Sequence, residues 1–452
     1  MQPSHKDFWF LPLGGCGEIG MNLNLFAHAG SWLMVDCGVT FERDPARADG
    51  RNRVEMPDPA FIANRSESLL GIIATHAHED HIGAISHLWE QFSCPIYTTP
   101  FTRNVILRKL REKRIDAPVI TVSDNETLQL GPFQISWLPI THSTPETHAL
   151  LIETPVARVL HTADWKLDSA PIVGAAFEPR RYQQVGRLGL DAVICDSTNA
   201  TVAGHSVSES ELFEDLLKAV QASPGRVVVA CFASNVARLQ TLGNVAHLAG
   251  RHLGMLGRSL HRMVSSARAA GYLRENFNVV DNFDLGYLLP GELLAIATGS
   301  QGEMNAALHR LAADTHPDVN LAAGDHVIFS AKTIPGNEKE VERLVHAFRA
   351  RGIQVTHADE SELSLHASGH PCADELKLMY EWLKPRLAVP VHGEDRHMTV
   401  NASLAREAGV PHQLVGRNGD LFDLVAGKRQ PAAAPVGRLW LDEEAGKLRR
   451  VE

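Results

Sequence analysis

The chain has 452 residues, of which 44% are hydrophobic and 21% are charged, and its formal net charge is −10. This composition allows a packed core in two or three domains, and the negative charge argues against a protein that coats nucleic acid. No apolar run approaches the roughly 20 residues that span a bilayer, and the N-terminus lacks the pattern of a signal peptide. We therefore expect a cytoplasmic protein with no membrane partner, and we expect its six cysteines to be reduced.

The first half of the chain is predicted to consist mainly of strands. Apolar patterns predict strands over 21–26, 31–35, 70–74, 133–138, 149–152 and 157–161. Apolar residues at helical spacing predict one helix among them, over 81–91.

From residue 208 the pattern changes to an alternation of strands and helices. Ser208-Glu209-Ser210-Glu211 has the capping residues that begin a helix. Predicted strands over 226–230, 293–297 and 326–329 are followed by predicted helices over 235–248, 303–312 and 338–351. This alternation predicts a parallel sheet with helices on both faces. A helix from about 374, a strand over 387–391, a further helix and a tail with a short terminal strand follow.

The motif with the clearest chemistry is Thr75-His76-Ala77-His78-Glu79-Asp80-His81, which follows the predicted strand 70–74. In an extended loop the first two histidines point to the same side. Imidazole and carboxylate ligands suit zinc, and a ligand set that includes several carboxylate oxygens also suits manganese. The candidate ligands in the whole chain are His76, His78, Asp80, His81, His142, Asp164 and His392. This set is too large for one tetrahedral ion and suits two ions that share a bridging carboxylate.

Asp36 ends the predicted strand 31–35, directly before Cys37-Gly38. We interpret Asp36 as an acceptor that orients a ligand histidine from the second shell of the metal site. An aspartate that caps a turn is the alternative.

The segment Gly15-Cys16-Gly17-Glu18-Ile19-Gly20 matches G-x-G-x-x-G, the pattern of a dinucleotide-binding loop. That pattern requires a helix after it, whereas the residues that follow alternate with the period of a strand. We therefore interpret the segment as a tight glycine loop at the rim of a cleft.

Two short polar segments, Ser234-Asn235 and Gly299-Ser300-Gln301, lie where a predicted strand gives way to a predicted helix. Free N–H groups at a helix N-terminus favour phosphate, and in a parallel sheet both segments share the carboxyl edge. Ordinary helix capping is the alternative for each segment. For Lys332 and Arg258, a solvated surface charge and a phosphate contact are equally open.

Taken together, these motifs resemble the bacterial ribonuclease J family, the β-CASP branch of the metallo-β-lactamase-fold nucleases. The resemblance covers about residues 10–425. It is carried, in the family's order, by 14–20, 76–81, 142–145, 161–164, 196–200, 232–235, 298–303, 334–338, 368–370 and 390–394.

The resemblance implies an α/β fold, a metallo-β-lactamase αββα sandwich with an inserted β-CASP α/β domain. The expected boundaries are 1–206 and 372–430 for the two segments of the sandwich, 207–371 for the insertion and 431–452 for a short tail. Members of the family commonly carry a further C-terminal domain that contributes to assembly. We therefore expect a short member without that domain, and a homodimer, if one forms, that is weaker than in longer relatives.

The resemblance also assigns the candidate ligands to two ions. The first ion would be held by His76, His78 and His142. The second ion would be held by Asp80, His81 and His392, and Asp164 would bridge the two. The expected cofactors are therefore two Zn²⁺ ions, with Mn²⁺ as a possible substitute.

The implied catalytic residues are Asp80, Asp196 and His370, with Asp196 at an acidic position beside the ions. Ser368, Gly369 and His370 match a phosphate-contacting motif. The expected substrate-binding set consists of these three residues and Ser234, Asn235 and Ser300. For His370, a purely structural histidine is the alternative.

The implied function is a zinc-dependent ribonuclease that hydrolyses RNA phosphodiester bonds with a hydroxide activated by two ions. We expect 5′-to-3′ exonuclease activity on RNA with a 5′-monophosphate, together with endonuclease activity. The alternatives are a hydrolase of the same fold that acts on DNA or on a small substrate such as a β-lactam, and a non-catalytic RNA-binding scaffold. RNA is the expected partner, and the sequence identifies no protein partner.

Overall fold

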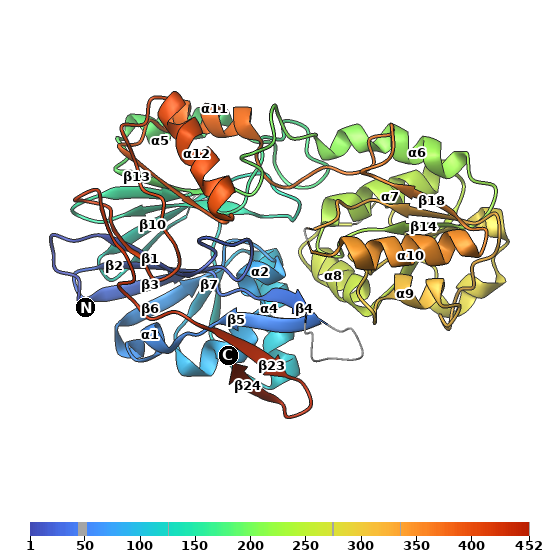
Figure 1. The fold of residues 1–452 in the computed structure, drawn as a ribbon, viewed down its shortest axis with the longest axis horizontal. Helices are drawn as coiled ribbons and strands as arrows, with labels where there is room; N and C mark the ends of the chain where they lie inside the picture. Colours follow the sequence, from blue (N-terminus) through green and yellow to red (C-terminus); the bar gives the residue numbers. More distant parts are fainter. Residues whose placement is uncertain (44–51, 125, 274, 335, 452) are drawn as a thin grey trace.

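The structure, a computed structural model, describes residues 1–43, 52–124, 126–273, 275–334 and 336–451. Two lobes lie side by side (Figure 1). The larger lobe holds both ends of the chain, and the smaller one holds the segment from α6 to β18, which we call the inserted lobe (residues 213–357). Pro335, which belongs to one of the motifs above, lies outside the described residues.

The larger lobe is a sandwich of two sheets. The first has the strand order β22-β21-β1-β2-β3-β6-β7-β8, and the second has the order β20-β19-β13-β12-β11-β10-β9. Apolar side chains from both sheets, such as Phe10, Phe26 and Trp137, form a common core between them. The strands of the first sheet are β1 (Trp9–Gly14), β2 (Leu23–His28), β3 (Ser31–Val35), β6 (Leu69–Ile73), β7 (Ile96–Thr98), β8 (Val119–Thr121), β21 (Leu421–Asp423) and β22 (Lys428–Gln430). Those of the second are β9 (Thr127–Leu130), β10 (Phe133–Pro139), β11 (His148–Glu153), β12 (Arg158–His161), β13 (Ala192–Asp196), β19 (Leu387–Val391) and β20 (His412–Gln413).

Helices cover the outer face of each sheet (Figure 1). Against the first sheet lie α1 (Ala60–Ala63), α3 (Ile85–Leu88) and α4 (Pro100–Lys113). Against the second lie α5 (Pro179–Arg187), α11 (Ala373–Leu383) and α12 (Asp395–Glu407). These four layers confirm the expected αββα sandwich.

The inserted lobe is built on one parallel sheet with the strand order β15-β16-β14-β17-β18, which confirms the predicted alternation of strands and helices. The strands are β14 (Val227–Ala230), β15 (His252–Leu256), β16 (Leu293–Ala297), β17 (His326–Phe329) and β18 (Gln354–His357). One face is covered by α6 (Phe213–Gln221), α7 (Val236–Leu248) and α8 (Arg258–Ala269). The other face is covered by α9 (Ala307–Ala312) and α10 (Glu338–Ala350).

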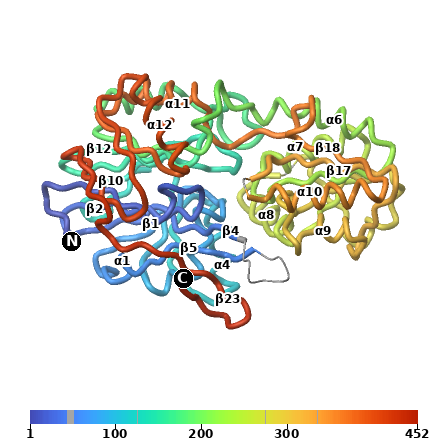
Figure 2. The backbone as a smooth tube through the Cα atoms, in the orientation of Figure 1, coloured from blue at the N-terminus to red at the C-terminus, as the bar shows by residue number. Residues whose placement is uncertain are grey.

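Two segments cross between the lobes side by side (Figure 2). We call residues 197–212, which include the 3-10 helix η3 (Glu209–Leu212), the first crossing segment, and residues 358–372 the second crossing segment. The buried Arg238 forms an ion pair with Glu209 of the first segment and donates a hydrogen bond to the carbonyl of Leu365 in the second, at 3.2 Å. One guanidinium therefore holds both connections against the inserted sheet.

A third sheet of the larger lobe is formed by β4 (Thr40–Arg43), β5 (Asn52–Pro57) and the end of the chain. The tail was expected to end in a short strand, which is confirmed, but a second strand precedes it. The tail forms a hairpin of β23 (Arg438–Asp442) and β24 (Lys447–Arg450), in which β23 pairs with β5. Pairing with β5 supplies the hydrogen-bond partners that a lone terminal strand would lack.

The segment 81–91 is largely helical, as expected, but it does not form one continuous helix. The segment is divided into α2 (Glu79–Ile82), α3 and η2 (Trp89–Gln91). The carbonyl of His81 accepts a hydrogen bond from the N–H of Cys37 at 2.7 Å, and the carbonyl of Cys37 accepts one from the N–H of Ala84 at 3.0 Å. These two backbone groups are therefore diverted from a continuous helix.

The helix expected over 303–312 begins later, as α9. The N–H of Leu308 donates to the carbonyl of Thr298 at 3.0 Å, so the loop folds back onto the end of β16. Gly299, with a φ of +109°, allows this turn. The expectation that Ser300 lies at the N-terminus of a helix is therefore wrong, because Ser300 belongs to the loop.

The predicted strand after the glycine loop is confirmed as β2, and all six cysteines are buried and free, as expected. Three further 3-10 helices are η1 (Ser66–Ser68), η4 (Asn282–Tyr287) and η5 (Pro290–Glu292). Among the described residues, every helix is too short or too polar to cross a membrane.

Candidate metal centre

The candidate ligands lie on loops that leave the ends of strands in both sheets of the larger lobe. The loop after β6 carries the histidine motif, and the loops after β10, β12 and β19 carry His142, Asp164 and His392. β3 with β6, and β12 with β13 and β19, are parallel neighbours, so their carboxyl ends meet at one edge of the sandwich. All seven candidate ligands are brought together there, in two groups that share one residue.

The first group consists of His76, His78, His142 and Asp164. His78 Nδ1 lies 3.2 Å from His76 Nε2 and 3.0 Å from His142 Nε2. Asp164 Oδ2 lies 3.7 Å from His76 Nε2 and 3.8 Å from His142 Nε2. Three imidazole nitrogens and one carboxylate oxygen therefore converge.

The second group contains the same oxygen of Asp164, together with Asp80, His81 and His392. Asp164 Oδ2 lies 3.1 Å from His81 Nε2 and 3.6 Å from His392 Nε2. Asp80 Oδ2 lies 3.4 Å from His81 Nε2 and 3.7 Å from His392 Nε2. Burial favours the neutral acid in Asp164, but His392 and His81 outweigh it and hold the pKa of this carboxyl well below its usual value.

These spacings fit divalent metal ions. Four ligand atoms at about 2.0–2.1 Å from a tetrahedral zinc ion lie roughly 3.3 Å from one another, close to the distances in both groups. Burial, aided by neighbouring imidazoles, lowers the pKa of His76 and His142 well below its usual value, and burial is also the main cause that lowers the pKa of His78 to about 4. These rings are therefore neutral, as metal ligands must be, and their lone pairs face one another.

Asp36 lies against the histidine motif. Its Oδ2 is 2.7 Å from His81 Nδ1 and accepts a hydrogen bond from Thr75 Oγ1 at 2.9 Å. Thr75 Oγ1 is in turn 3.0 Å from His76 Nδ1. A carboxylate that holds one ring nitrogen leaves the other directed at the centre. Asp36 occupies this place with a φ of +64°, a strained conformation for a residue other than glycine.

Sequence reasoning missed two further contacts of this kind. Asn22 Oδ1 lies 3.0 Å from His392 Nδ1, and Asn22 Nδ2 donates to the carbonyl of Asp80 at 3.1 Å. The carbonyl of Gly369 lies 2.6 Å from His142 Nδ1. The buried amide of Asn22, directly before an apolar strand, is a signal that could have identified it, because an unpaired amide is unfavourable to bury. A backbone carbonyl leaves no such signal in a sequence.

His370 lies at the edge of the cluster. Its Nδ1 is 2.8 Å from Asp196 Oδ2, and its Nε2 is 4.0 Å from Asp164 Oδ2. Burial alone would lower the pKa of His370, but the charges of Asp196 and Asp164 outweigh it and raise that pKa to about 9. The imidazole is therefore held in place by one carboxylate and turned towards another.

Ser368 and Gly369 precede His370 in the second crossing segment. Ser368 Oγ accepts a hydrogen bond from Asn199 Nδ2 at 2.8 Å. A Cβ atom on Gly369 would lie 2.5 Å from Cε1 of His142, so only glycine fits beside this ring. The segment that leaves the inserted lobe thus lies directly against the metal cluster.

Ser234, Asn235 and Ser300 lie in the inserted lobe instead. They follow β14 and β16, which are neighbouring parallel strands, so they share one edge of the sheet. The Asn235 side chain accepts a hydrogen bond from Arg238 N at 2.9 Å and caps α7. Within the described part of the chain, no hydrogen bond or ion pair joins these three residues to the histidine cluster.

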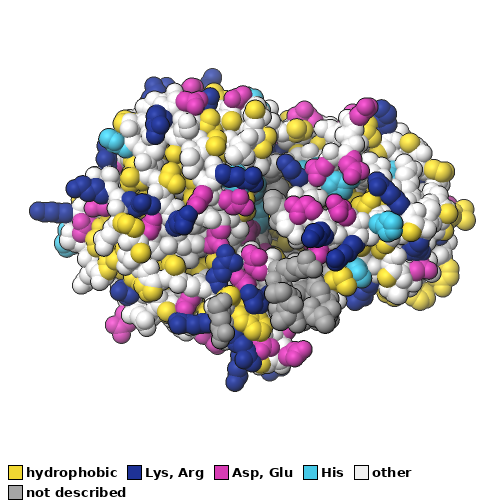
Figure 3. All heavy atoms as spheres, viewed as in Figure 1, with side chains coloured by type: hydrophobic (Ala, Val, Ile, Leu, Met, Phe, Trp, Pro, Cys, Tyr) yellow, Lys and Arg dark blue, Asp and Glu magenta, His cyan; other side chains and the backbone are white. Residues whose placement is uncertain are grey.

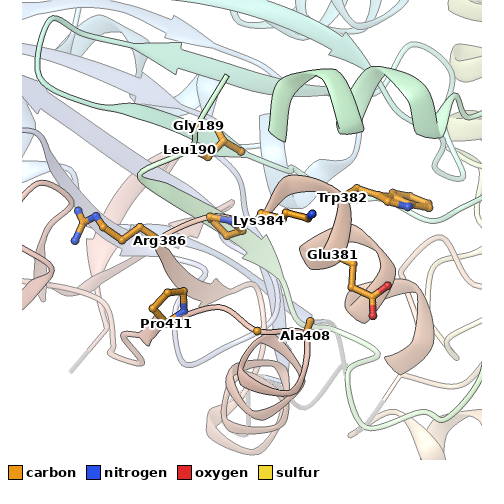
Figure 4. A pocket seen from close by; sticks show the side chains of 10 residues that line it. Gly189, Leu190, Glu381, Trp382, Lys384, Arg386, Ala408 and Pro411 are labelled. Carbon is orange, nitrogen blue, oxygen red and sulfur yellow. The ribbon is translucent and has the colours of Figure 1, made fainter. Parts of the chain in front are cut away.

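The molecular surface is hollowed between the lobes, with basic and acidic side chains on both rims (Figure 3). Lys332 and Arg258 are exposed, which leaves both interpretations of these residues open. A separate cavity of about 730 Å³ lies on the larger lobe, lined in part by Trp382, Lys384 and Arg386 (Figure 4). Its described lining contains none of the candidate ligands, so this cavity is distinct from the metal cluster.

Three family models match the chain. The metallo-beta-lactamase superfamily matches residues 21–229, the ribonuclease J beta-CASP domain matches residues 224–348, and the Zn-dependent metallo-hydrolase RNA specificity domain matches residues 364–415. Together they follow the larger lobe, the inserted lobe and the return to the larger lobe.

Similar proteins agree with these matches. The chain is 40% identical to ribonuclease J of Sinorhizobium meliloti over 97% of its own length and 78% of the relative. It is 37% identical to ribonuclease J of Mycolicibacterium smegmatis, over 95% of the chain and 77% of the relative. A crystal structure of a protein of unknown function from Enterococcus faecalis shares the fold, with a TM-score of 0.61 at 14% identity, over 92% of this chain and 99% of that one. The chain therefore belongs to the ribonuclease J family of metal-dependent, metallo-β-lactamase-fold nucleases.

Proposed function

We propose that this protein is a zinc-dependent ribonuclease that uses two Zn²⁺ ions and also accepts Mn²⁺. The observation that carries this proposal is the shared Oδ2 atom of Asp164, around which six further ligands are arranged in two groups. His76, His78 and His142 would hold one ion, and Asp80, His81 and His392 the other. When bound, the two ions supply charge stabilisation for a phosphoryl group and a nucleophile at neutral pH.

The protein's own groups would orient the scissile phosphate. Asp196 holds Nδ1 of His370, which leaves Nε2 free to donate a hydrogen bond to a phosphate oxygen. Ser368 presents its hydroxyl from the same segment. Asp80 belongs to the second ligand group, so its proposed catalytic role is to hold the second ion.

We further propose that RNA is cut from its 5′ end when that end carries a monophosphate. Ser368, Gly369 and His370 border the cluster, and Ser234, Asn235 and Ser300 share an edge of the inserted sheet. A terminal phosphate held by Ser234, Ser300 and the segment from Ser368 to His370, with Asn235 capping the helix beside them, would set how far the chain reaches towards the ions. Nucleotides would then be removed in the 5′-to-3′ direction, and each product would carry a new 5′-phosphate for the next step. Internal cleavage would occur when no such end is bound.

One digestion experiment tests this proposal. RNA of one sequence, labelled at either end, is prepared with a 5′-monophosphate, a 5′-triphosphate or a 5′-hydroxyl, and is digested with and without a chelator. Single-stranded DNA and a chromogenic β-lactam serve as control substrates. We expect the monophosphate RNA to be degraded fastest and the chelator to stop the reaction. Equal rates on all three ends with only internal cuts would contradict the exonuclease proposal, and faster cleavage of DNA or the β-lactam would contradict the ribonuclease proposal.

A further inference from the structure

The C-terminal hairpin is joined to the metal centre through one arginine. Arg438, the first residue of β23, forms an ion pair with Glu18 of the glycine loop. It also donates to Glu55 Oε2 at 3.0 Å and lies 3.4 Å from Glu42 Oε1. Glu55 is fully buried, and the side chain of Glu18 is only 16% exposed. A single guanidinium therefore contacts carboxylates on three different segments of the larger lobe.

Glu18 also connects Arg438 to the start of the glycine loop through Asn418. Its Oε1 accepts a hydrogen bond from Asn418 Nδ2 at 2.5 Å. Asn418 binds the backbone of Cys16 on both sides, because its Oδ1 accepts from Cys16 N at 2.9 Å and its own N–H donates to the carbonyl of Cys16 at 3.0 Å. The loop is thus fixed by a side chain that Arg438 helps to hold.

The same loop holds His392 in two ways. The carbonyl of Gly15 accepts a hydrogen bond from the N–H of His392 at 2.6 Å. The backbone of Gly15 also lies against Asn22, whose Oδ1 is 3.0 Å from His392 Nδ1, and a Cβ atom on Gly15 would lie 2.2 Å from that oxygen. His392 itself has a φ of +52°. Because this backbone conformation is strained, it depends on external contacts to be maintained.

We propose that Arg438 is a positioning residue for His392. It thereby sets the affinity of the second ligand group for its metal ion. This inference rests on the proposed two-ion centre. Without Arg438, Glu55 would keep its ion pair with Arg53, but the largely buried carboxylate of Glu18 would lose its cation and would be held less firmly against Asn418. The glycine loop would then be free to shift, and the two contacts that direct His392 towards Asp164 would weaken.

Metal titration of the apoprotein tests this inference. The metal is removed with a chelator, and Zn²⁺ is returned in competition with a chromophoric chelator of known affinity. A change in a group that orients a ligand reduces metal affinity about 10- to 100-fold. Because Arg438 acts through such a group and does not touch the ligand itself, we expect an effect at the low end of this range. Arg438→Gln should therefore weaken the binding of one of the two ions about tenfold. Asn418→Ala should produce the same loss, and Arg438→Lys should restore part of the affinity because it keeps the charge.

Arg449→Gln is the matched control. Arg449 lies on the neighbouring strand β24 and pairs with Asp442 of the same hairpin, at 2.7 Å. The control should bind both ions like the unaltered protein. Equal losses in Arg438→Gln and Arg449→Gln would show that the hairpin only stabilises the fold, and unchanged affinity in Arg438→Gln would also overturn the inference.

The path through His392 is tested by combining variants. In a His392→Ala background, Arg438→Gln should have no further effect on the remaining ion, because the residue that it positions is gone. A further tenfold loss in that background would overturn the inference. If the unaltered protein binds fewer than two ions per chain, the proposed two-ion centre fails. If the unaltered protein and Arg438→Gln both bind two ions per chain with the same affinity, the two-ion centre stands and only the positioning role of Arg438 fails.

Discussion

Each lobe ends its parallel strands in polar loops, yet the two sets of loops use their side chains differently. In the larger lobe, His76, His142 and Asp164 direct their ligand atoms at a common centre. In the inserted lobe, two of the polar side chains that follow strands are engaged within the lobe itself. Asn235 caps α7, and the Gln301 side chain donates to the carbonyl of Lys332 at 3.0 Å and accepts from Ile334 N at 2.8 Å.

This difference shows what a loop at the end of a strand needs in order to become a binding site. Neutral imidazoles whose lone pairs face one another, as those of His76, His78 and His142 do, are unfavourable without a cation between them. Small polar side chains, in contrast, complete their hydrogen bonds with the nearest backbone groups. The comparison therefore predicts large effects for changes in the metal cluster and small ones for changes in the inserted lobe.

The largest effect is expected for Asp164→Ala. This change removes the oxygen that both ligand groups share, so binding of both ions should weaken. Activity on RNA should fall by more than the roughly 100-fold that is lost when only an outer-shell partner is removed. Elemental analysis and RNA turnover, measured on the same preparation, check this expectation. A variant with two tightly bound ions and normal turnover would show that Asp164 is not a bridge.

His370→Ala and His392→Ala should separate catalysis from metal binding. Asp196 holds His370 beside the cluster. Loss of the His370 side chain should lower turnover about 10²- to 10³-fold, the usual effect of removing one hydrogen-bond donor to the reacting group, while metal content stays at the normal level. His392→Ala should lower metal occupancy. The two variants are compared by metal analysis and single-turnover RNA cleavage. A loss of metal in His370→Ala would instead make His370 a ligand.

Asp36→Asn is expected to have an intermediate effect. The amide keeps the shape of the carboxylate but not its charge, so it holds His81 less firmly, and metal affinity should fall about 10- to 100-fold. Asp124→Asn is a matched control, because Asp124 also pairs with a histidine, His148, at 2.8 Å, but away from the cluster. Chelator competition on both variants checks the expectation. Equal metal affinity in Asp36→Asn and Asp124→Asn would contradict the orienting role of Asp36.

The sequence was a better guide to ligand types and strand positions than to contacts made by the backbone. The strands 293–297, 326–329 and 387–391 were predicted with the bounds that β16, β17 and β19 have, because continuous apolar runs mark buried parallel strands. The histidine motif was equally apparent, since imidazole and carboxylate groups have few other reasons to cluster.

Other features could not be predicted because they depend on contacts between distant segments. Helix α2 is short because the carbonyl of His81 is taken by Cys37, and α9 begins late because Leu308 bonds to Thr298. The support that Gly369 gives to His142 comes from a backbone carbonyl, which every residue has. The C-terminal hairpin likewise depends on β5, which lies almost 400 positions earlier in the chain and was not among the predicted strands.

The smallest effect is expected in the inserted lobe, where two neighbouring residues separate substrate contact from fold stability. Ser234→Ala removes a hydroxyl, and a hydrogen bond to a charged phosphate contributes about 1.5 kcal/mol at the low end of its range, so the preference for 5′-monophosphate over 5′-hydroxyl RNA should fall about tenfold. Asn235→Ala removes the cap of α7 and should lower the free energy of unfolding by about 1 kcal/mol. It should leave the preference between 5′ ends unchanged, because its oxygen already accepts from Arg238 N. Cleavage rates on the two RNAs, together with urea unfolding, distinguish these outcomes. If Ser234→Ala changes only stability, the polar edge of the inserted sheet serves the fold alone, and the proposed recognition of the 5′ end would rest only on the segment from Ser368 to His370.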